Sequence, residues 1–510
     1  MRRRVELAAA LAAAGLAALA CSSHAIAPAA TPTAATATPR GAVPSGDWLR
    51  FGYDAQRSGV GPASTGITAA NVGGLGVRVV HLDGTADGSA IELHAIRVSG
   101  RPRDVAVVTT TYGRTIAVDP GTGGKLWEYT PGDIGSYQGS SQITTATPIA
   151  DPDRRFVYAA SPDGLIHKLS VATGRQVTTG HWPARVTFDP RREKIASALN
   201  IDGADLLVTT GGYFGDAPTY EGHVAEIDRS SGRIVAVWNA DCAERHYLLD
   251  PPSSCRADTS FGGSAIWARA GAVVEPGGAR ILVATANGPF DGTTDWGDSV
   301  LELSAGGLRL LHNWTPANQA ALNSGDTDLG STAPAILPAL GGYRLAVQGG
   351  KDGQLHLLDL GRLDGTDAGP GPRLGGQLQD VAAPGAGQVF TAPAVWSHSG
   401  HVYVLVADDS GTAAYLVSGG AHPHLSVAWA NGNPGTSPVL AGGLLYVYDE
   451  RGGRLRVYYP GLGRQLASLP AAPGHWNSPI VVAGRVLLPT GDANDHATSG
   501  ELIVYHLRGR

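Results

Sequence analysis

A single unit, built of short apolar strands and glycine-containing turns, recurs along the sequence. Its clearest copy opens at Ser437-Pro438-Val439, continues through a strand at 444–448 and a turn at 451–453, and returns through a strand at 455–458. Related copies open at 147–149, 333–336 and 392–395. Each copy has room for about four strands, which cannot bury both of their faces alone. The copies must therefore pack against one another.

The number of copies and the way the series ends define the expected architecture. Eight copies are centred on strands near Val105, Val157, Leu206, Leu282, Leu345, Val402, Leu444 and Val486. The last copy ends at 505–507 without a fourth strand, and 75–80 could supply it, which would leave no open sheet edge. The sequence predicts an all-β, eight-bladed β-propeller of four-stranded antiparallel blades, the last one closed by the N-terminal strand. Seven blades is the alternative, if the region around Leu206 is irregular.

Composition agrees with this architecture and limits the partners. The 510 residues include 71 Gly and 33 Pro, which interrupt helices and favour turns. The formal net charge of −6 offers no basic surface, so no nucleic-acid partner is expected. We expect a monomer whose partner is an envelope protein or a small-molecule ligand.

The N-terminus has the pattern of an export signal. Arg2, Arg3 and Arg4 precede an apolar stretch that ends at Ala20 and is too short to span a bilayer. Cys21 follows in a context that resembles a lipobox, which predicts a lipoprotein on the outer face of the cell membrane. Ordinary cleavage, giving a secreted or periplasmic protein, is the alternative. We predict a signal segment at 1–21, a flexible linker rich in Ala, Thr and Pro at 22–46, and the propeller at 47–510, with membrane contact only through a lipid on Cys21.

Two cysteines remain besides Cys21, namely Cys242 and Cys255. In an oxidising compartment such a pair is expected to form a disulfide. The sequence has no Cys-x-x-Cys pair for zinc and no Cys-x-x-Cys-His for covalent haem.

One hairpin resembles a known repeat. The stretch from Ile116 to Trp127 is similar to the signature of pyrroloquinoline-quinone (PQQ) repeats, with one residue inserted, and weaker copies lie at 169–174 and 227–238. The lead-in at 47–54 also looks like that of the quinoprotein alcohol dehydrogenase-like superfamily. The resemblance covers roughly residues 46–507. It implies that Trp127, Trp238 and Trp429 dock one blade on the next.

The resemblance also implies candidate site residues. Asn287 falls where the enzymes of this superfamily bind calcium, and Lys351 falls where they contact the quinone, although a turn could also explain Lys351. Asp326 and Asp328 are the candidate catalytic bases, after a longer gap than in the enzymes. Such a site would oxidise a hydroxyl group through a carboxylate base and a metal that holds the quinone.

Other parts of the enzyme site do not match. The sequence has no adjacent cysteine pair, and the calcium-binding Glu would fall between Asp216 and Glu221, out of register. Arg269 stands where the enzymes carry a floor Trp, with Trp267 two residues away. The sequence therefore favours a non-orthodox member that acts as a binding or scaffold module in the cell envelope, with no cofactor assured. A PQQ- and calcium-dependent dehydrogenase of alcohols or polyols is the alternative.

Overall fold

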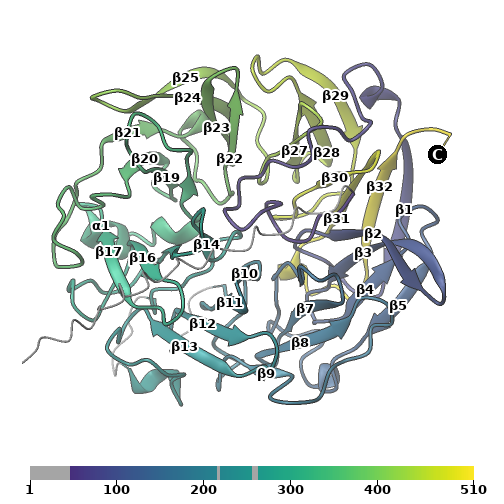
Figure 1. Cartoon of the computed structure of the whole chain (residues 1–510), viewed down its shortest axis with the longest axis horizontal. Helices are drawn as coiled ribbons and strands as arrows, with labels where there is room; N and C mark the ends of the chain where they lie inside the picture. Colours follow the sequence, from purple (N-terminus) through teal and green to yellow (C-terminus); the bar gives the residue numbers. More distant parts are fainter. Residues whose placement is uncertain (1–45, 215–218, 256–261, 510) are drawn as a thin grey trace, which may run out of the picture. The chain divides into compact units, whose positions relative to one another are not determined.

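The computed structural model describes residues 46–214, 219–255 and 262–509. The predicted signal segment and nearly all of the predicted linker, with Cys21, lie outside these residues. Eight four-stranded antiparallel sheets follow one another around a ring (Figure 1). The region around Leu206 forms a regular sheet of its own, so the eight-bladed prediction is confirmed and the seven-bladed alternative is wrong. Among the described residues, no helix is long and apolar enough to cross a membrane.

Each of the first four blades is built from consecutive strands, written from the axis outward. Blade 1 contains β2 (Ile91–Val98), β3 (Arg101–Thr109), β4 (Thr115–Val118) and β5 (Lys125–Tyr129). Blade 2 contains β6 (Ile149–Ala150), β7 (Phe156–Ser161), β8 (Leu165–Ser170) and β9 (Ala184–Arg185). Blade 3 contains β10 (Asn200–Asp202), β11 (Asp205–Thr209), β12 (His223–Asp228) and β13 (Ile234–Asn239). Blade 4 contains β14 (Val273–Val274), β15 (Arg280–Ala284), β16 (Val300–Ser304) and β17 (Leu310–Trp314).

The next three blades repeat the pattern, and the last one departs from it. Blade 5 contains β18 (Ala335–Ile336), β19 (Leu345–Gly349), β20 (Gln354–Asp359) and β21 (Gln379–Ala382). Blade 6 contains β22 (Ala394–His398), β23 (His401–Ala407), β24 (Thr412–Ser418) and β25 (His424–Asn431). Blade 7 contains β26 (Val439–Ala441), β27 (Leu444–Asp449), β28 (Arg454–Tyr458) and β29 (Gln465–Pro470). Blade 8 contains β30 (Ile480–Val482), β31 (Arg485–Thr490), β32 (Gly500–His506) and, as its outer strand, β1 (Gly76–Leu82).

The closure of blade 8 joins the two ends of the ring. Strand β1 pairs antiparallel with β32, from Gly76 opposite His506 to Leu82 opposite Gly500. The predicted closure is therefore confirmed. The described helical segments are short and lie in connections: η1 (Val72–Gly74), η2 (Ile134–Ser136), η3 (Pro252–Ser254), α1 (Gln319–Ser324), η4 (Leu329–Ser331), η5 (Pro384–Ala386) and η6 (Ala493–Asp495).

A repeated contact joins the outer strand of one blade to the next blade. The indole of Trp127 donates to the carbonyl of Val171, and that of Trp429 donates to the carbonyl of Pro460. A Cβ placed on Gly174 or Gly463 would come within 2.6 Å and 2.5 Å of these rings, so the turn needs glycine where the indole covers it. Trp238 is buried in the cluster that includes Ile281 and Leu303 of blade 4.

The predicted disulfide is confirmed. Cys242 and Cys255 are bonded, with their Cα atoms 5.9 Å apart. The bridge lies in the connection between β13 and β14. It constrains part of this connection, which is the longest between consecutive blades.

Candidate functional site

The axis of the ring opens at one end into a cavity of about 550 Å³, which we call the funnel. Its wall is formed by the segments that lead into the inner strands and by loops between the second and third strands of blades 3, 5 and 8. A cavity of this size is typical of small-molecule sites.

One position in the repeat supplies much of the funnel wall. Four residues before the inner strands of blades 1, 2, 3, 4, 6 and 8 stand Asp87, Thr145, Ala196, Arg269, Phe390 and Trp476, which all line the funnel. Residues two apart in extended chain point the same way. Accordingly, Lys194, Trp267 and Gln388, each two residues further from the strand, line it as well.

Three aromatic rings from blades 4, 6 and 8 meet in the funnel. The ring centroids of Trp267 and Trp476 lie 5.4 Å apart with nearly parallel planes, and Phe390 stacks on Trp476 at 5.2 Å. All three side chains are only partly buried. The Arg269 guanidinium lies 4.6 Å above the Trp476 ring. The funnel therefore presents uncovered aromatic surface beside a cation.

A buried carboxylate positions this aromatic group. Asp87 is fully buried and accepts hydrogen bonds from Arg269, from His475 Nδ1 at 2.8 Å, and from the backbone of Trp476 and Ala493. Although burial favours the neutral acid, Arg269 and His475 hold the pKa of Asp87 below its usual value. The Asp87 oxygens are thus already used, even though Asp87, His475 and Asp492 offer ligand atoms within 4.8 Å of one another.

Lys194 differs from the other cations of the funnel. Its backbone is held by reciprocal hydrogen bonds with Gly211. Among the residues that the structure describes, no acceptor lies within hydrogen-bonding distance of its Nζ. Burial, and then the nearby Arg269, lower the pKa of Lys194 to about 8.

The four residues suggested by the superfamily resemblance come together on one side of the funnel. Lys351 Nζ lies 2.6 Å from Asp328 Oδ2 and 3.2 Å from Asp326 Oδ1. Asn287 donates through Nδ2 to Asp326 and through its backbone N–H to Asp328, both at 2.9 Å. Although burial opposes it, the two carboxylates raise the pKa of Lys351. Lys351, Asp326 and Asp328 line the funnel.

This arrangement does not fit a calcium ion. The Asn287 amide oxygen is buried without a hydrogen-bond partner, as a ligand to a cation could be. However, the Lys351 ammonium already holds both carboxylates, and a calcium ion beside it would be repelled. In the described part of the chain, only Asp87, His475 and Asp492 form a set of three or more acid, histidine or cysteine groups whose ligand atoms all lie within 4.8 Å of one another. The calcium site implied by the resemblance is therefore not assembled around Asn287.

The other described residues compared with the enzymes are distributed between the funnel and the surrounding loops. Asp216 is outside the described residues. Glu221 is buried and accepts from the backbone of Asp241, while its own N–H donates to Glu193. Trp267 lines the funnel, as does Arg269 two residues later.

Sequence reasoning missed Lys194, Asp87, Phe390, His475 and Trp476. A signal was nevertheless present in the repeat. In blades 2, 5, 6, 7 and 8 a proline directly precedes the inner strand. Phe390 and Trp476 each stand three residues before the proline of their own blade. Reading that position across the copies that carry the proline would have selected Phe390 and Trp476.

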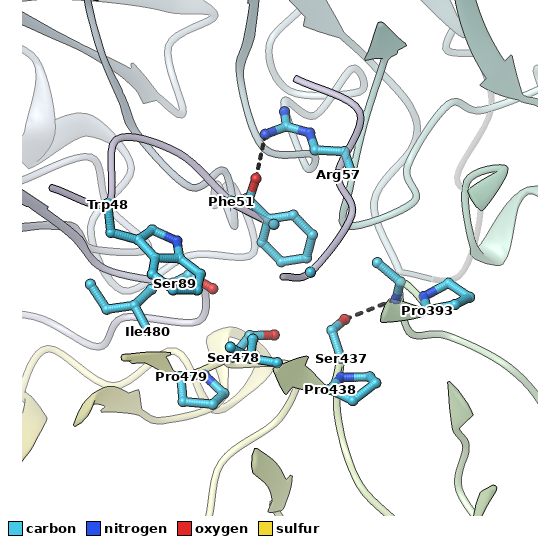
Figure 2. Close-up of a pocket in the computed structure, with 14 residues that line it drawn as sticks. Trp48, Phe51, Arg57, Ser89, Pro393, Ser437, Pro438, Ser478, Pro479 and Ile480 are labelled. Atoms are coloured by element: carbon cyan, nitrogen blue, oxygen red, sulfur yellow. Dashed lines mark hydrogen bonds between the residues drawn. The ribbon is translucent and has the colours of Figure 1, made fainter. Parts of the chain in front are cut away.

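The far end of the axis is closed by the lead-in at 48–62. Its backbone bonds to one inner strand after another, with partners Glu92, Ala150, Val274, Val395 and Leu440. Figure 2 shows Trp48 and Phe51 of the lead-in on one side of a small pocket and Pro393, Pro438 and Pro479 of the blades on the other, while the Arg57 guanidinium donates to the Phe51 carbonyl. The void left between them measures about 10 Å³, which is room for about one water. The described lead-in therefore fills the axis at this end, and the funnel opens at the other.

A buried histidine supports the Lys351 loop and is expected to make stability depend on pH. His356 pairs with Asp352 and Asp380, which overcome its burial and raise its pKa to about 9. The free histidine titrates near 6.5, so the stabilisation of about 3 kcal/mol is complete below pH 6.5 and lost as pH rises through 9. Urea unfolding at pH 6 to 10 should show the difference between the wild type and His356→Gln shrinking across this window. A constant difference would contradict the assignment.

A comparison with known protein families supports the resemblance to PQQ repeats over part of the sequence. Residues 82–240 match the PQQ-type repeat family described as outer membrane protein assembly factor BamB. Residues 82–240 of this eight-bladed β-propeller therefore resemble PQQ-type repeats. No protein with a curated description matches the sequence significantly.

Solved structures of similar fold include three alcohol or methanol dehydrogenases. The quinohemoprotein alcohol dehydrogenase from Comamonas testosteroni is 16% identical with a TM-score of 0.64, over 91% of this chain and 81% of that chain. The enzyme ADHIIG from Pseudomonas putida HK5 is 15% identical with a TM-score of 0.66, over the same shares. A europium-containing methanol dehydrogenase is 16% identical with a TM-score of 0.62, over 91% and 98%. At these identities the likeness of this propeller to the three enzymes concerns the fold alone.

Proposed function

We propose that this protein is a binding propeller of the cell envelope and that its funnel holds a flat ring compound. The observation that carries the proposal is the group of three partly buried rings, Trp267, Phe390 and Trp476, inside a cavity of about 550 Å³. Stacking on such rings adds about 0.5–1.5 kcal/mol to the burial of apolar area. The closed far end directs the ligand to this site.

The location follows from the N-terminus and the disulfide. Residues 1–21 would direct export, and Cys21 would carry the lipid that holds the protein at the outer face of the membrane. The Cys242–Cys255 bond suits an oxidising compartment. Metabolic labelling with palmitate, absent in Cys21→Ser, tests the anchor.

A PQQ-dependent dehydrogenase is the second candidate. The gathering of Asn287, Asp326, Asp328 and Lys351 on one side of the funnel favours it. The ion pairs of Lys351 speak against it, because they use the carboxylates that a calcium ion or a catalytic base would need. A dehydrogenase would bind PQQ only with calcium, whereas a binding protein needs no metal.

Calorimetric titration of the mature protein separates these candidates. We expect 2-naphthoate to bind without calcium, and cyclohexanecarboxylate, which lacks the aromatic face, to bind about two- to tenfold more weakly. Trp476→Leu should weaken naphthoate binding by a similar factor. The matched control is Trp396→Leu, because Trp396 stacks on His398 in β22, away from the funnel.

The same titration with PQQ, with and without millimolar calcium, tests the second candidate. Binding of PQQ that requires calcium and is lost in Lys351→Ala would replace the proposal by the dehydrogenase. If neither 2-naphthoate nor PQQ gives a binding heat, the result would contradict a small-molecule site in the funnel.

A further inference from the structure

The chain has four lysines, and three of them are held by partners. Lys125 pairs with Asp83 and Glu128, both at 2.8 Å. Lys168 donates to a backbone carbonyl at 2.7 Å and lies 4.5 Å above the Phe156 ring. Lys351 is held by its two aspartates. An amine whose lone pair is bound up as an ammonium in an ion pair is a poor nucleophile.

Lys194 is the exception. Its Nζ has no acceptor within hydrogen-bonding distance among the described residues, and the side chain lines the funnel beside the aromatic group. The charged groups that act on it are Arg269, Asp87 and Asp492. Asp87 is bound by Arg269 and His475, so its charge is already balanced. The surroundings therefore disfavour an ammonium at this place.

The protonation of Lys194 suits nucleophilic attack. With a pKa of about 8, about half of the Lys194 amines are uncharged at pH 8, against less than about 1% at the ordinary lysine pKa near 10.4. Buried lysines lacking a counter-ion are activated in this way. The aromatic rings would hold a flat aldehyde beside the amine, which raises its effective concentration.

We propose that Lys194 captures an aromatic aldehyde in the funnel as a reversible imine. The Nζ lone pair attacks the carbonyl carbon, the carbinolamine loses water, and a C=N bond replaces C=O. The carbonyl oxygen leaves in that water with both amine protons, so no oxidant or reductant is consumed. The inference rests on the proposed function, since it names how one class of flat ring compound would be retained.

Reductive trapping tests the inference on the full mature chain. The protein is incubated with 2-naphthaldehyde and cyanoborohydride at pH 7.5, and adducts are located by peptide mass mapping. With only four lysines, each site is assigned directly. We expect Lys194 to be modified at least about tenfold faster than Lys125, Lys168 or Lys351, because it alone is both desolvated and unpaired. Equal labelling of all four, or faster labelling of another lysine, would overturn the inference.

Two controls keep the two proposals apart. Lys194→Arg retains a cation but not the nucleophile, and it should abolish the fast adduct while Lys168→Arg leaves it unchanged. Excess 2-naphthoate should suppress the Lys194 adduct by occupying the funnel, a measurement that does not depend on a variant folding. Naphthoate binding without a Lys194 adduct would refute the imine and leave the binding function standing. Absence of both would refute the binding function as well.

Discussion

Substituting Arg57 by Asn is expected to lower the free energy of unfolding by about 4 kcal/mol. The guanidinium is only 3% exposed and donates to the carbonyls of Phe51, Ala198, Leu199 and Ala270 at 2.7 to 3.3 Å. These acceptors belong to the lead-in and to the segments before the inner strands of blades 3 and 4. Removing one side chain therefore leaves several buried carbonyls without donors, and each such loss costs about 1–3 kcal/mol.

Asn is the suitable replacement because Arg57 has a φ of 60°, which Asn tolerates better than Ala does. Urea unfolding followed by circular dichroism measures the change. Arg175→Ala, at an exposed turn, is the matched control and should change stability by less than about 0.5 kcal/mol. A loss below about 1 kcal/mol for Arg57→Asn would mean that water replaces the guanidinium and that the lead-in does not seal the axis.

The ring could be predicted because its information is local and repeated. Each hairpin carries its own turn signal, such as Gly164 at a φ of 77°, and the strand left over at 75–80 matched the strand missing from the last copy. Closure then followed from the cost of an open sheet edge. Seven blades were considered only for the case that the copy near Leu206 is irregular, and its strands form a regular four-stranded sheet instead.

The funnel could be predicted only in part, because its residues come from irregular segments of different blades. The positions of Asn287 and Lys351 relative to the superfamily signature identified them as candidates. In the structure both residues bind the same two aspartates, Asp326 and Asp328. The signature could not show that Lys351 pairs with Asp326 and Asp328, since the connection that carries these two aspartates has no periodic sequence pattern. Trp476 and Lys194 act together only once the ring has brought blades 3 and 8 to one axis.

Removing Arg485 is expected to weaken the closure of the ring by about 3–5 kcal/mol. Arg485 begins β31 of blade 8 and pairs with Glu92 and with Asp104 of blade 1, the latter at 2.7 Å. Glu92 is fully buried. Burial raises its pKa to about 7 even though Arg485 opposes the shift. In Arg485→Met the carboxyl would lose its counter-ion and would have to be buried either charged and alone or protonated.

The pH dependence of this deficit identifies its cause. A Glu92 carboxyl with a raised folded-state pKa takes up a proton more readily in the folded state, so its contribution is most favourable below the free value near 4.3 and is lost as pH rises. The gap between Arg485→Met and the wild type should therefore be larger at pH 8 than at pH 5. The double variant Arg485→Met, Glu92→Gln should recover part of the loss at pH 8, whereas Arg454→Met, at an exposed strand start, should change little. A deficit independent of pH and unrelieved by Glu92→Gln would assign the loss to packing of the arginine stem, with the ion pair itself contributing little to holding the first and last blades together.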